Sequence, residues 1–266
     1  MLDLFWYQYL IIALTFIWSG FVRSGLGFGG SVFALPFLLM VVNDPLVWLP
    51  LISVHLLVFS SLTVYQNNKK SALTVANNHR ATSNDAIAGT IDWKYLRYSL
   101  SIMIVPKLIG VLGLVTLAPK LLSSIIFVII AAYSLTYILN KPFKSNNKAL
   151  DIIFLMLGGY ISGTSLIGAP LIIAVYANHV KREQLRDTLF VLWFILVTIK
   201  MATFIYVGIN LQLIHHLWLL PCAAIGHIIG LHFHDKMLNT DPTVFYRYLG
   251  WLLLATSVLG IIHMFI

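Results

Sequence analysis

Long apolar stretches alternate with short polar ones along this chain, and six of the apolar stretches have the length of one bilayer span. A helix needs about 20 apolar residues to cross the hydrocarbon core of a membrane. The six predicted spans cover residues 46–65, 95–117, 121–139, 188–208, 211–233 and 245–265. The pattern therefore predicts an all-α polytopic membrane protein.

Two further apolar stretches, residues 4–42 and 149–178, do not fit one span each. As a single helix the first would be about 58 Å long, against a hydrocarbon core of about 30 Å. We interpret each stretch as a hairpin of helix, glycine turn and helix. The arms at 31–42, 149–161 and 169–177 are short, so we expect re-entrant hairpins or half-helices, buried in protein or facing water.

The turn of each hairpin is a glycine-rich break, and the two breaks stand at matching points of the two halves. The first contains Gly20, Gly25, Gly27, Gly29 and Gly30. The second contains Gly158, Gly159, Gly163 and Gly168, followed by Pro170. Paired interruptions of this kind indicate the binding site of a transporter built from repeats. Close helix packing is the alternative explanation for the glycines. No strand precedes either break, which argues against a dinucleotide site.

The positions of lysine and arginine favour the hairpin interpretation. If each long stretch crossed the membrane once, the bases in the loops would divide eight against six. If each stretch enters and returns, thirteen lie on one side and only Lys120 on the other. The thirteen are Lys69, Lys70, Arg80, Lys94, Arg97, Lys141, Lys144, Lys148, Lys181, Arg182, Arg186, Lys236 and Arg247. The positive-inside rule therefore predicts hairpins, with both termini outside the cytoplasm.

Each half then holds five helical elements, an odd number, so the second half is expected to be inverted relative to the first. We expect a first repeat at residues 1–140, a polar linker at 141–148 and a second, inverted repeat at 149–266, each a hairpin plus three spans. The polar segment 66–92 is expected to form a cytoplasmic loop. Inverted repeats of this kind underlie alternating access in secondary transporters.

Composition supports a membrane location, because 59% of the residues are hydrophobic and only 10% are charged. Soluble domains carry about 25% charged residues. The net charge of +8 comes mostly from bases beside the spans, so it indicates orientation in the bilayer rather than binding of nucleic acid. We expect a multi-pass protein of the cell (inner or plasma) membrane.

The charged residues inside the predicted spans are basic. None of the nine carboxylates lies near the middle of a span, whereas Lys107 and Lys200 do. A lysine at the bilayer centre costs roughly 2.5–3.5 kcal/mol, so a bound anion or water is its natural partner. Snorkelling toward the surface is the alternative. His55 and His227 are also central, and either carry protons or hydrogen-bond to a neighbouring helix.

The glycine breaks complement these bases. Half-helices starting near Gly30 and Gly168 would aim free N–H groups at the membrane interior, which suits an oxyanion. Arg23 could bind an anion through two hydrogen bonds. The candidate binding residues are Arg23, Ser24, Gly27, Gly29, Gly30, Ser31, Lys107, Ser162, Thr164, Ser165, Gly168 and Lys200, with His55 and His227 as candidates for proton coupling.

We expect neither a metal nor a cofactor. His215 with His216, and His232 with His234, could suggest a metal, but no cysteine or carboxylate stands at a typical spacing from them. No nucleophile, base and acid are arranged for catalysis.

Several motifs together carry a resemblance. They are Gly25-Leu-Gly27-Phe-Gly29-Gly30 followed by Pro36, Gly163-x4-Gly168-Ala-Pro170, Gly89-Thr-Ile-Asp-Trp93, Gly110-x-x-Gly113, Gly226-x3-Gly230 and Arg186-Asp-Thr188. In their order and duplication the chain resembles the TauE/SafE family of anion permeases over residues 11–262. It departs from the family at Ile167-Gly-Ala-Pro, where Gly-Gly-Gly or Gly-Gly-Pro is usual. The resemblance implies transport of sulfite, sulfonates such as sulfoacetate, or other small sulfur-containing or carboxylate anions.

The sequence thus predicts a secondary transporter that moves a small sulfur-containing or organic anion by alternating access at a midplane site. Its expected partners are the anion and the lipid bilayer. The alternatives are an anion channel and, less favoured, an integral membrane enzyme or assembly factor. The identity of the anion, the direction of transport, the coupling ion and the oligomeric state stay open.

Overall fold

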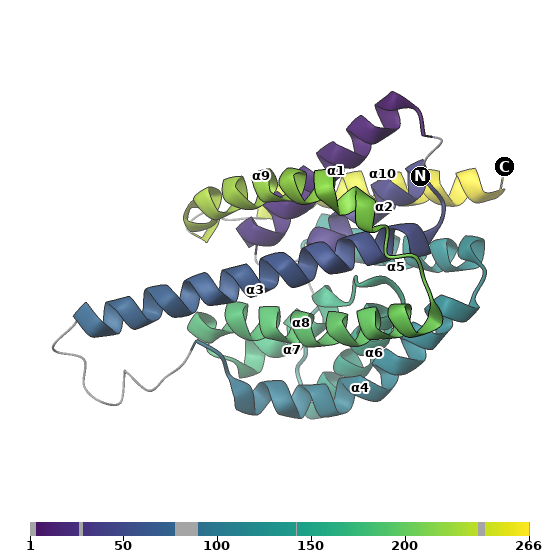
Figure 1. The fold of residues 1–266 in the computed structure, drawn as a ribbon. Coiled ribbons are helices and arrows are strands. Elements are labelled where there is room, and N and C mark those ends of the chain that lie inside the picture. The colour runs from purple at the N-terminus through teal and green to yellow at the C-terminus, as the bar shows by residue number, and fades with distance from the viewer. Residues whose placement is uncertain (1–3, 27–28, 78–89, 142, 239–242, 266) are drawn as a thin grey trace.

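The computed structural model describes residues 4–26, 29–77, 90–141, 143–238 and 243–265, and these fold into ten helices without a strand among them (Figure 1). The helices are α1 (Trp6–Leu26), α2 (Gly30–Val41), α3 (Pro45–Asn77), α4 (Trp93–Thr116), α5 (Pro119–Ile138), α6 (Lys148–Ser165), α7 (Ala169–His179), α8 (Arg182–Val207), α9 (Leu213–Leu238) and α10 (Thr243–Phe265). The predicted class, an all-α polytopic membrane protein, is confirmed.

Five of the six predicted spans are confirmed as helices long and apolar enough to cross a bilayer. They are Pro45–Lys69, Trp93–Thr116, Pro119–Ile138, Arg182–Val207 and Leu213–Phe233. The sixth, predicted at 245–265, falls within α10, whose apolar part at Arg247–His263 is shorter than the other five.

Three helices differ from their predicted bounds. The helix α3 continues to Asn77, so the prediction of a loop from residue 66 is wrong for 66–77. No glycine or proline stands between Pro50 and Gly89 to end that helix, and Asn67 Nδ2 donates a hydrogen bond of 2.7 Å to Asp187 Oδ1 at the start of α8. The helix α8 starts at Arg182 rather than 188, and α6 extends to Ser165 rather than 161.

Eight of the ten helices form a central pair with three further pairs around it. The helices α3 and α8 lie side by side in the middle, with α1 against α9 on one flank and α4 against α6 on the other (Figure 1). The third pair, α5 and α10, packs against α2. The helix α1 thus meets its partner in the second half of the chain, and α6 meets its partner in the first half.

Glycines allow these helix pairs to approach closely. A Cβ added at Gly226 of α9 would lie 1.8 Å from the carbonyl oxygen of Ile17 in α1. A Cβ at Gly163 of α6 would lie 2.5 Å from the carbonyl oxygen of Lys107 in α4. The packing explanation for glycine therefore holds at these two positions, and it also explains why α6 remains helical through Gly163.

Helices end and begin at both predicted breaks. The helix α1 ends at Leu26 and α2 begins at Gly30, while α6 ends at Ser165 and α7 begins at Ala169. Left-handed backbone marks each turn, at Gly29 with φ 85° and at Leu166 with φ 61°. The arms of each hairpin pack against each other, α1 on α2 and α6 on α7.

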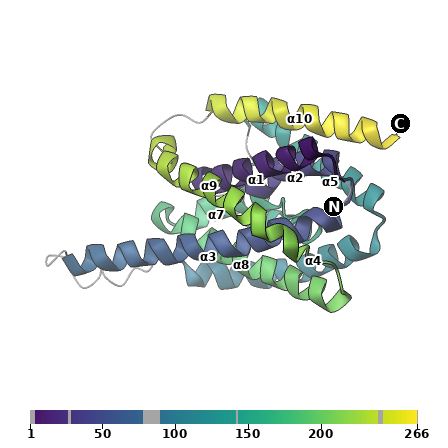
Figure 2. The ribbon, with the colours of Figure 1, turned by 45° about the horizontal axis from the view of Figure 1, so that its top comes forward.

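The first hairpin opens at the end of the bundle where α3 begins. Trp48 of α3 donates its Nε1 hydrogen to the carbonyl oxygen of Val42, directly after α2. The ring of Tyr9, near the start of α1, packs edge-on against that of Trp218, near the start of α9. The start of α1 and the end of α10 lie at this same end of the bundle (Figures 1 and 2).

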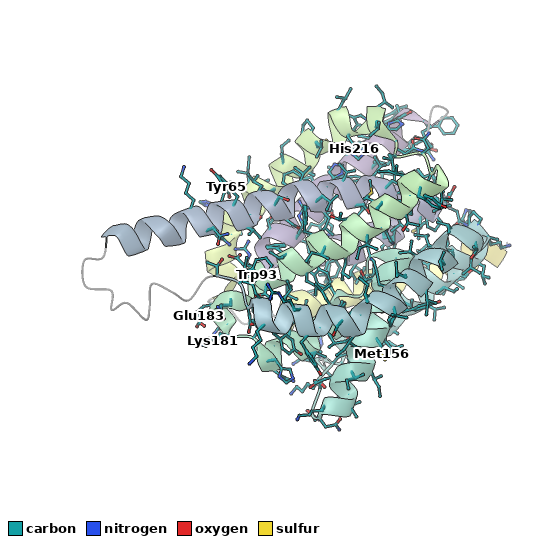
Figure 3. The ribbon with its side chains drawn as sticks, turned by 60° about the horizontal axis from the view of Figure 1, so that its bottom comes forward. Tyr65, Trp93, Met156, Lys181, Glu183 and His216 are labelled. Atoms are coloured by element: carbon teal, nitrogen blue, oxygen red, sulfur yellow. The ribbon has the colours of Figure 1, made fainter. Side chains whose placement is uncertain are left out.

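The second hairpin opens at the opposite end, where α3 finishes. His179, the last residue of α7, pairs with Asp151 of α6 at 2.9 Å and stacks on Tyr95 at the start of α4. The backbone N–H of Asp92, directly before α4, donates to Thr188 Oγ1 near the start of α8. Figure 3 shows Trp93, Lys181 and Glu183 together at this end, with His216 toward the other. Opposite openings are what an inverted repeat requires; the repeat itself stays a prediction.

Candidate functional site

A cavity of about 30 Å³ lies beside the first glycine break, among residues of α1, α2, α3, α8 and α9. Its polar side chains are Ser19, Arg23, Ser31, His55 and Ser60, and its aromatic ones are Phe16, Phe190 and Trp193. Gly29 and Gly30, at the start of α2, complete the polar part of the wall. Of the predicted site residues, the structure therefore brings Arg23, Gly29, Gly30, Ser31 and His55 together.

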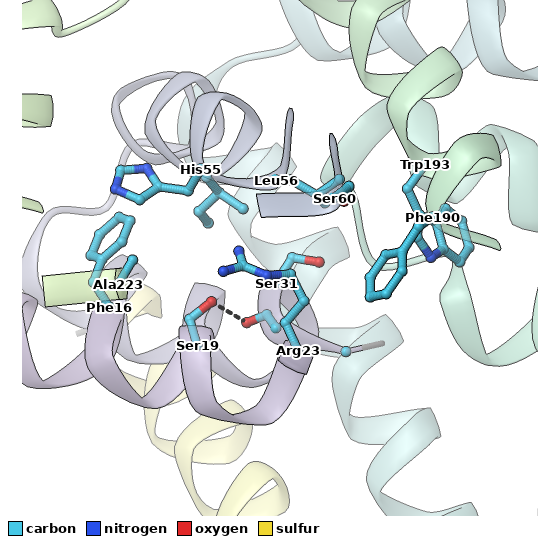
Figure 4. A pocket seen from close by; sticks show the side chains of 13 residues that line it. Phe16, Ser19, Arg23, Ser31, His55, Leu56, Ser60, Phe190, Trp193 and Ala223 are labelled. Carbon is cyan, nitrogen blue, oxygen red and sulfur yellow. Dashed lines mark hydrogen bonds between the residues drawn. The ribbon is translucent and has the colours of Figure 1, made fainter. Parts of the chain in front are cut away.

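Arg23 carries the charge of this cavity. Its side chain is only 6% exposed, and its guanidinium lies 4.6 Å from the centre of the Phe59 ring. Its Nη2 has no hydrogen-bond partner in the described part of the chain. Figure 4 shows the guanidinium pointing into the cavity, between Ser19 and His55. A buried guanidinium with free donors is costly unless an anion pairs with it.

The serines of the cavity hold its backbone in place. Ser19 Oγ donates a hydrogen bond of 3.0 Å to the carbonyl oxygen of Gly30, which fixes the start of α2 against α1. Ser31 Oγ donates to the carbonyl oxygen of Leu166 at 2.7 Å, so the first break touches the second. Ser60 Oγ lacks a partner among the residues described. Ser31, predicted as a donor to the anion, thus uses its hydrogen to join the two hairpins.

The start of α2 adds a second positive element. Gly29 and Gly30 line the cavity directly, and the positive end of the α2 dipole lies there. The N–H groups of a first helical turn have no partner within the helix. Together with Arg23 they form an electropositive wall.

His55 closes one side of the cavity. Its Nδ1 lies 2.6 Å from the carbonyl oxygen of Leu51, which can only accept, so this nitrogen carries the hydrogen. The ring packs between Phe16, at 4.7 Å between centroids, and His216, at 5.4 Å. His216, which sequence patterns place near the membrane surface without a role, is 7% exposed.

His227 and Ser24 form a separate pair next to the cavity. Their Nδ1 and Oγ atoms lie 2.5 Å apart, and the His227 ring packs on Phe59, the same ring that Arg23 covers. Arg186 donates from Nη2 to the carbonyl oxygen of Ser24 at 2.9 Å. These predicted residues therefore surround the C-terminal end of α1 rather than line the cavity.

Lys107 and Lys200 form a second polar group and do not line the Arg23 cavity. Both side chains are completely buried, so neither snorkels. Lys107 Nζ donates to Ser162 at 2.9 Å to the carbonyl oxygen and 3.1 Å to Oγ. Lys200 Nζ has no hydrogen-bond partner in the part of the chain that the structure describes. The sequence predicts one site, whereas the structure separates the lysines from the Arg23 cavity.

The remaining predicted residues belong to the second break or are not described. Thr164 and Ser165 both donate to the carbonyl oxygen of Ile161, at 3.1 and 3.0 Å. A Cβ at Gly168 would lie 2.2 Å from the carbonyl oxygen of Gly158, so this glycine packs the arms together. Gly27 lies outside the described residues.

Sequence reasoning missed Ser19, Ser60, Phe190 and Trp193. Ser19 stands four residues before Arg23, on the same face of one helix, so helical spacing could have found it. The aromatic residues come from α8, far along the chain, and only the fold brings them to the cavity.

Carboxylates stay away from the buried cations. The ion pair at His179 and Asp151 is the one found in the described ranges, and it lies at the end of the bundle. The described residues also contain no group of three His, Cys, Asp or Glu residues that could hold a metal.

Comparison with known proteins gives one family. No curated protein and no solved structure matches the chain. The family of the sulfite exporter TauE/SafE matches residues 12–259, nearly the whole chain, and the protein described above belongs to that family.

Proposed function

We propose that this protein is a secondary transporter that moves a small sulfur-containing or organic anion across the cell membrane, with sulfite as the first candidate. The observation that carries the proposal is Arg23, a buried guanidinium with a free donor that points into a cavity beside the start of a helix. Membership of a sulfite exporter family supports the same class of substrate.

The size of the cavity favours a small anion. About 30 Å³ admits only a few atoms, so a bulkier organic anion such as sulfoacetate would require the surrounding helices to separate. An oxyanion in this space would receive hydrogen bonds from Arg23 and from the first turn of α2.

Alternating access would follow from movement around this cavity. The stack of Phe16, His55 and His216 lies toward the end where α3 begins, and Arg186 with Ser24 lies toward the other end. We propose that separating one of these contacts at a time opens the cavity to one side of the membrane. The positive-inside rule, applied to the thirteen bases that the sequence assigns to one side, supports a cytoplasmic location for that side and termini outside the cytoplasm.

A channel and an enzyme are less well supported. A channel needs a continuous pore when open, whereas this cavity is small and lined by packed aromatic side chains. Catalysis needs a nucleophile or metal next to a base. Ser24 and His227 do put a hydroxyl beside an imidazole, but they do not line the cavity, whose Arg23 and serines offer binding groups for an anion.

A thermal-shift experiment on the purified protein tests the binding site. We expect sulfite to raise the melting temperature of the wild type, because binding to the folded state stabilises it. Arg23→Gln should weaken the apparent affinity about 10- to 100-fold, the effect of losing a hydrogen bond to a charged group. Lys94→Gln, at an exposed position on α4, is the matched control and should bind like the wild type. Equal affinity in Arg23→Gln would contradict the proposed site.

A further inference from the structure

The buried lysines are not used by the proposed anion site, and their surroundings differ from those of Arg23. Neither Lys107 nor Lys200 lines the Arg23 cavity. Both side chains are fully buried, and Lys200 lies within electrostatic reach of Lys107. Two ammonium groups this close, without a carboxylate beside them, repel each other strongly in a medium of low polarity.

The hydrogen bonds favour a charge on Lys107 rather than on Lys200. Lys107 donates to both the carbonyl oxygen and the hydroxyl of Ser162, which suits an ammonium group. Lys200 Nζ has no acceptor among the described residues, and it lies 5.9 Å from the centre of the Phe204 ring. An ammonium group needs acceptors for its three hydrogens, whereas a neutral amine tolerates their absence far better.

The other titratable groups on the helices that pack against α8 contact residues other than Lys200. The helix α8 contacts α3, α4, α6 and α7. Their buried or partly buried titratable groups, besides Lys107, are His55 at the cavity, Tyr176 bonded to Ser99, Tyr95 packed on the Tyr176 ring, and Asp151 paired with the exposed His179. Lys107 is therefore the charged group that decides the protonation of Lys200.

We propose that Lys200 is a proton-binding site that couples anion transport to the proton gradient. In the closed conformation its amine is neutral; when the helices separate and water enters, the nitrogen lone pair takes up a proton from water. The proposal rests on the proposed function, because it assigns the second polar group of the same transporter. It replaces His55 and His227 as the candidates for coupling.

Hydrogen bonds connect the cavity to Lys107, the charged neighbour of Lys200. Ser31, in the cavity wall, donates to the carbonyl oxygen of Leu166, and Leu166 donates its N–H to the carbonyl oxygen of Ser162, the atom that also accepts from Lys107. An anion near Arg23 adds negative charge at one end of this chain, and Lys107, the neighbour of Lys200, stands at the other. The added negative charge favours the protonated form of Lys200. Because such coupling is reciprocal, the anion and the proton would move in the same direction.

Proteoliposomes that contain a pH-sensitive dye test the coupling. Sulfoacetate is the probe, since its charge is fixed near neutral pH, and its radiolabelled flux is measured alongside the proton flux. We expect about one proton per anion in the wild type and a ratio at least tenfold lower in Lys200→Met. Lys200→Arg, which keeps its charge permanently, should lose proton flux as well, and Lys94→Met is the control. Anion flux without proton flux in the wild type would overturn the proposal.

A second measurement does not depend on transport. A neutral Lys200 takes up a proton when the chain unfolds, because an exposed lysine is charged below about pH 10. The unfolded state then binds more protons, so raising the pH toward 10 should raise the melting temperature of the wild type relative to Lys200→Met. An unchanged difference between pH 7 and pH 9.5 would refute the neutral lysine. If this test succeeds and no anion moves, the proposed function fails rather than the protonation state.

Discussion

At the scale of single residues, three buried cations define what the interior can bind. Arg23, Lys107 and Lys200 are each at most 6% exposed, and no ion pair in the described ranges reaches them. The surroundings of the three charged groups differ. Arg23 points into a cavity, Lys107 donates to Ser162, and Lys200 has no acceptor in the ranges described. Lys107 and Lys200, two buried residues of the same type, therefore differ in their hydrogen bonding.

Glycine gives a prediction at this scale. In Gly226→Ala the new methyl group would meet the backbone of α1, because its Cβ would lie 1.8 Å from the carbonyl oxygen of Ile17. Overpacking of this kind costs about 1–3 kcal/mol, so we expect a clearly lower melting temperature in detergent. In Gly113→Ala, where no atom lies within 4 Å, the better helix propensity of alanine should leave stability equal or higher. Equal effects of the two substitutions would contradict the packing between α1 and α9.

The sequence predicted part of the site. It pointed to the buried lysines through the cost of charge in a bilayer, and to Arg23 through its place beside a glycine break. It could not separate the lysines from Arg23, because depth in the membrane says nothing about which face of a helix a residue occupies. Trp193 and His216 have ordinary sequence surroundings, so their places at the cavity follow only from how α8 and α9 pack.

At the scale of helices, the sequence predicted that the breaks and most spans exist, but it placed the ends of some helices wrongly. Both breaks fall where glycines gather, since a turn and a close approach both require them. The end of α3 was predicted wrongly, because polarity marks where a helix leaves the membrane and not where it ends. Polar residues without a helix breaker continued the helix to Asn77.

The orientation of the two hairpins can be tested by labelling single cysteines. In a Cys222→Ala background, Tyr7→Cys lies near the open end of the first hairpin and Lys148→Cys at that of the second, both at exposed positions. We expect a membrane-impermeant maleimide to label Tyr7→Cys in intact spheroplasts. Lys148→Cys should react only after the membrane is permeabilised, as should the control Lys181→Cys, which lies at the same end as Glu183 and Trp93. Labelling of both hairpins from the same side would contradict their opposite orientation.

At the scale of the whole molecule, helix pairs form across the two halves of the chain, and α1, α3, α8 and α9 of these pairs line the cavity. The helix α1 packs on α9 and α6 packs on α4, while α3 and α8, one from each half, lie between these pairs. A relative movement of the flanks along α3 and α8 would change the walls of the cavity without unfolding any helix. The order of helices along each half could be predicted from the sequence. The pairing of helices from one half with helices from the other could not, since it depends on long-range contacts.

Counterflow in proteoliposomes tests the central claim, alternating access of a small anion at the Arg23 cavity, most directly. Vesicles loaded with unlabelled sulfite are diluted into radiolabelled sulfite at a much lower concentration. A transporter should accumulate label transiently, because each returning binding site exchanges one anion for another, and Arg23→Gln should abolish the overshoot. Label that only equilibrates, with an electrical conductance and no overshoot in the wild type, would contradict the account and indicate a channel.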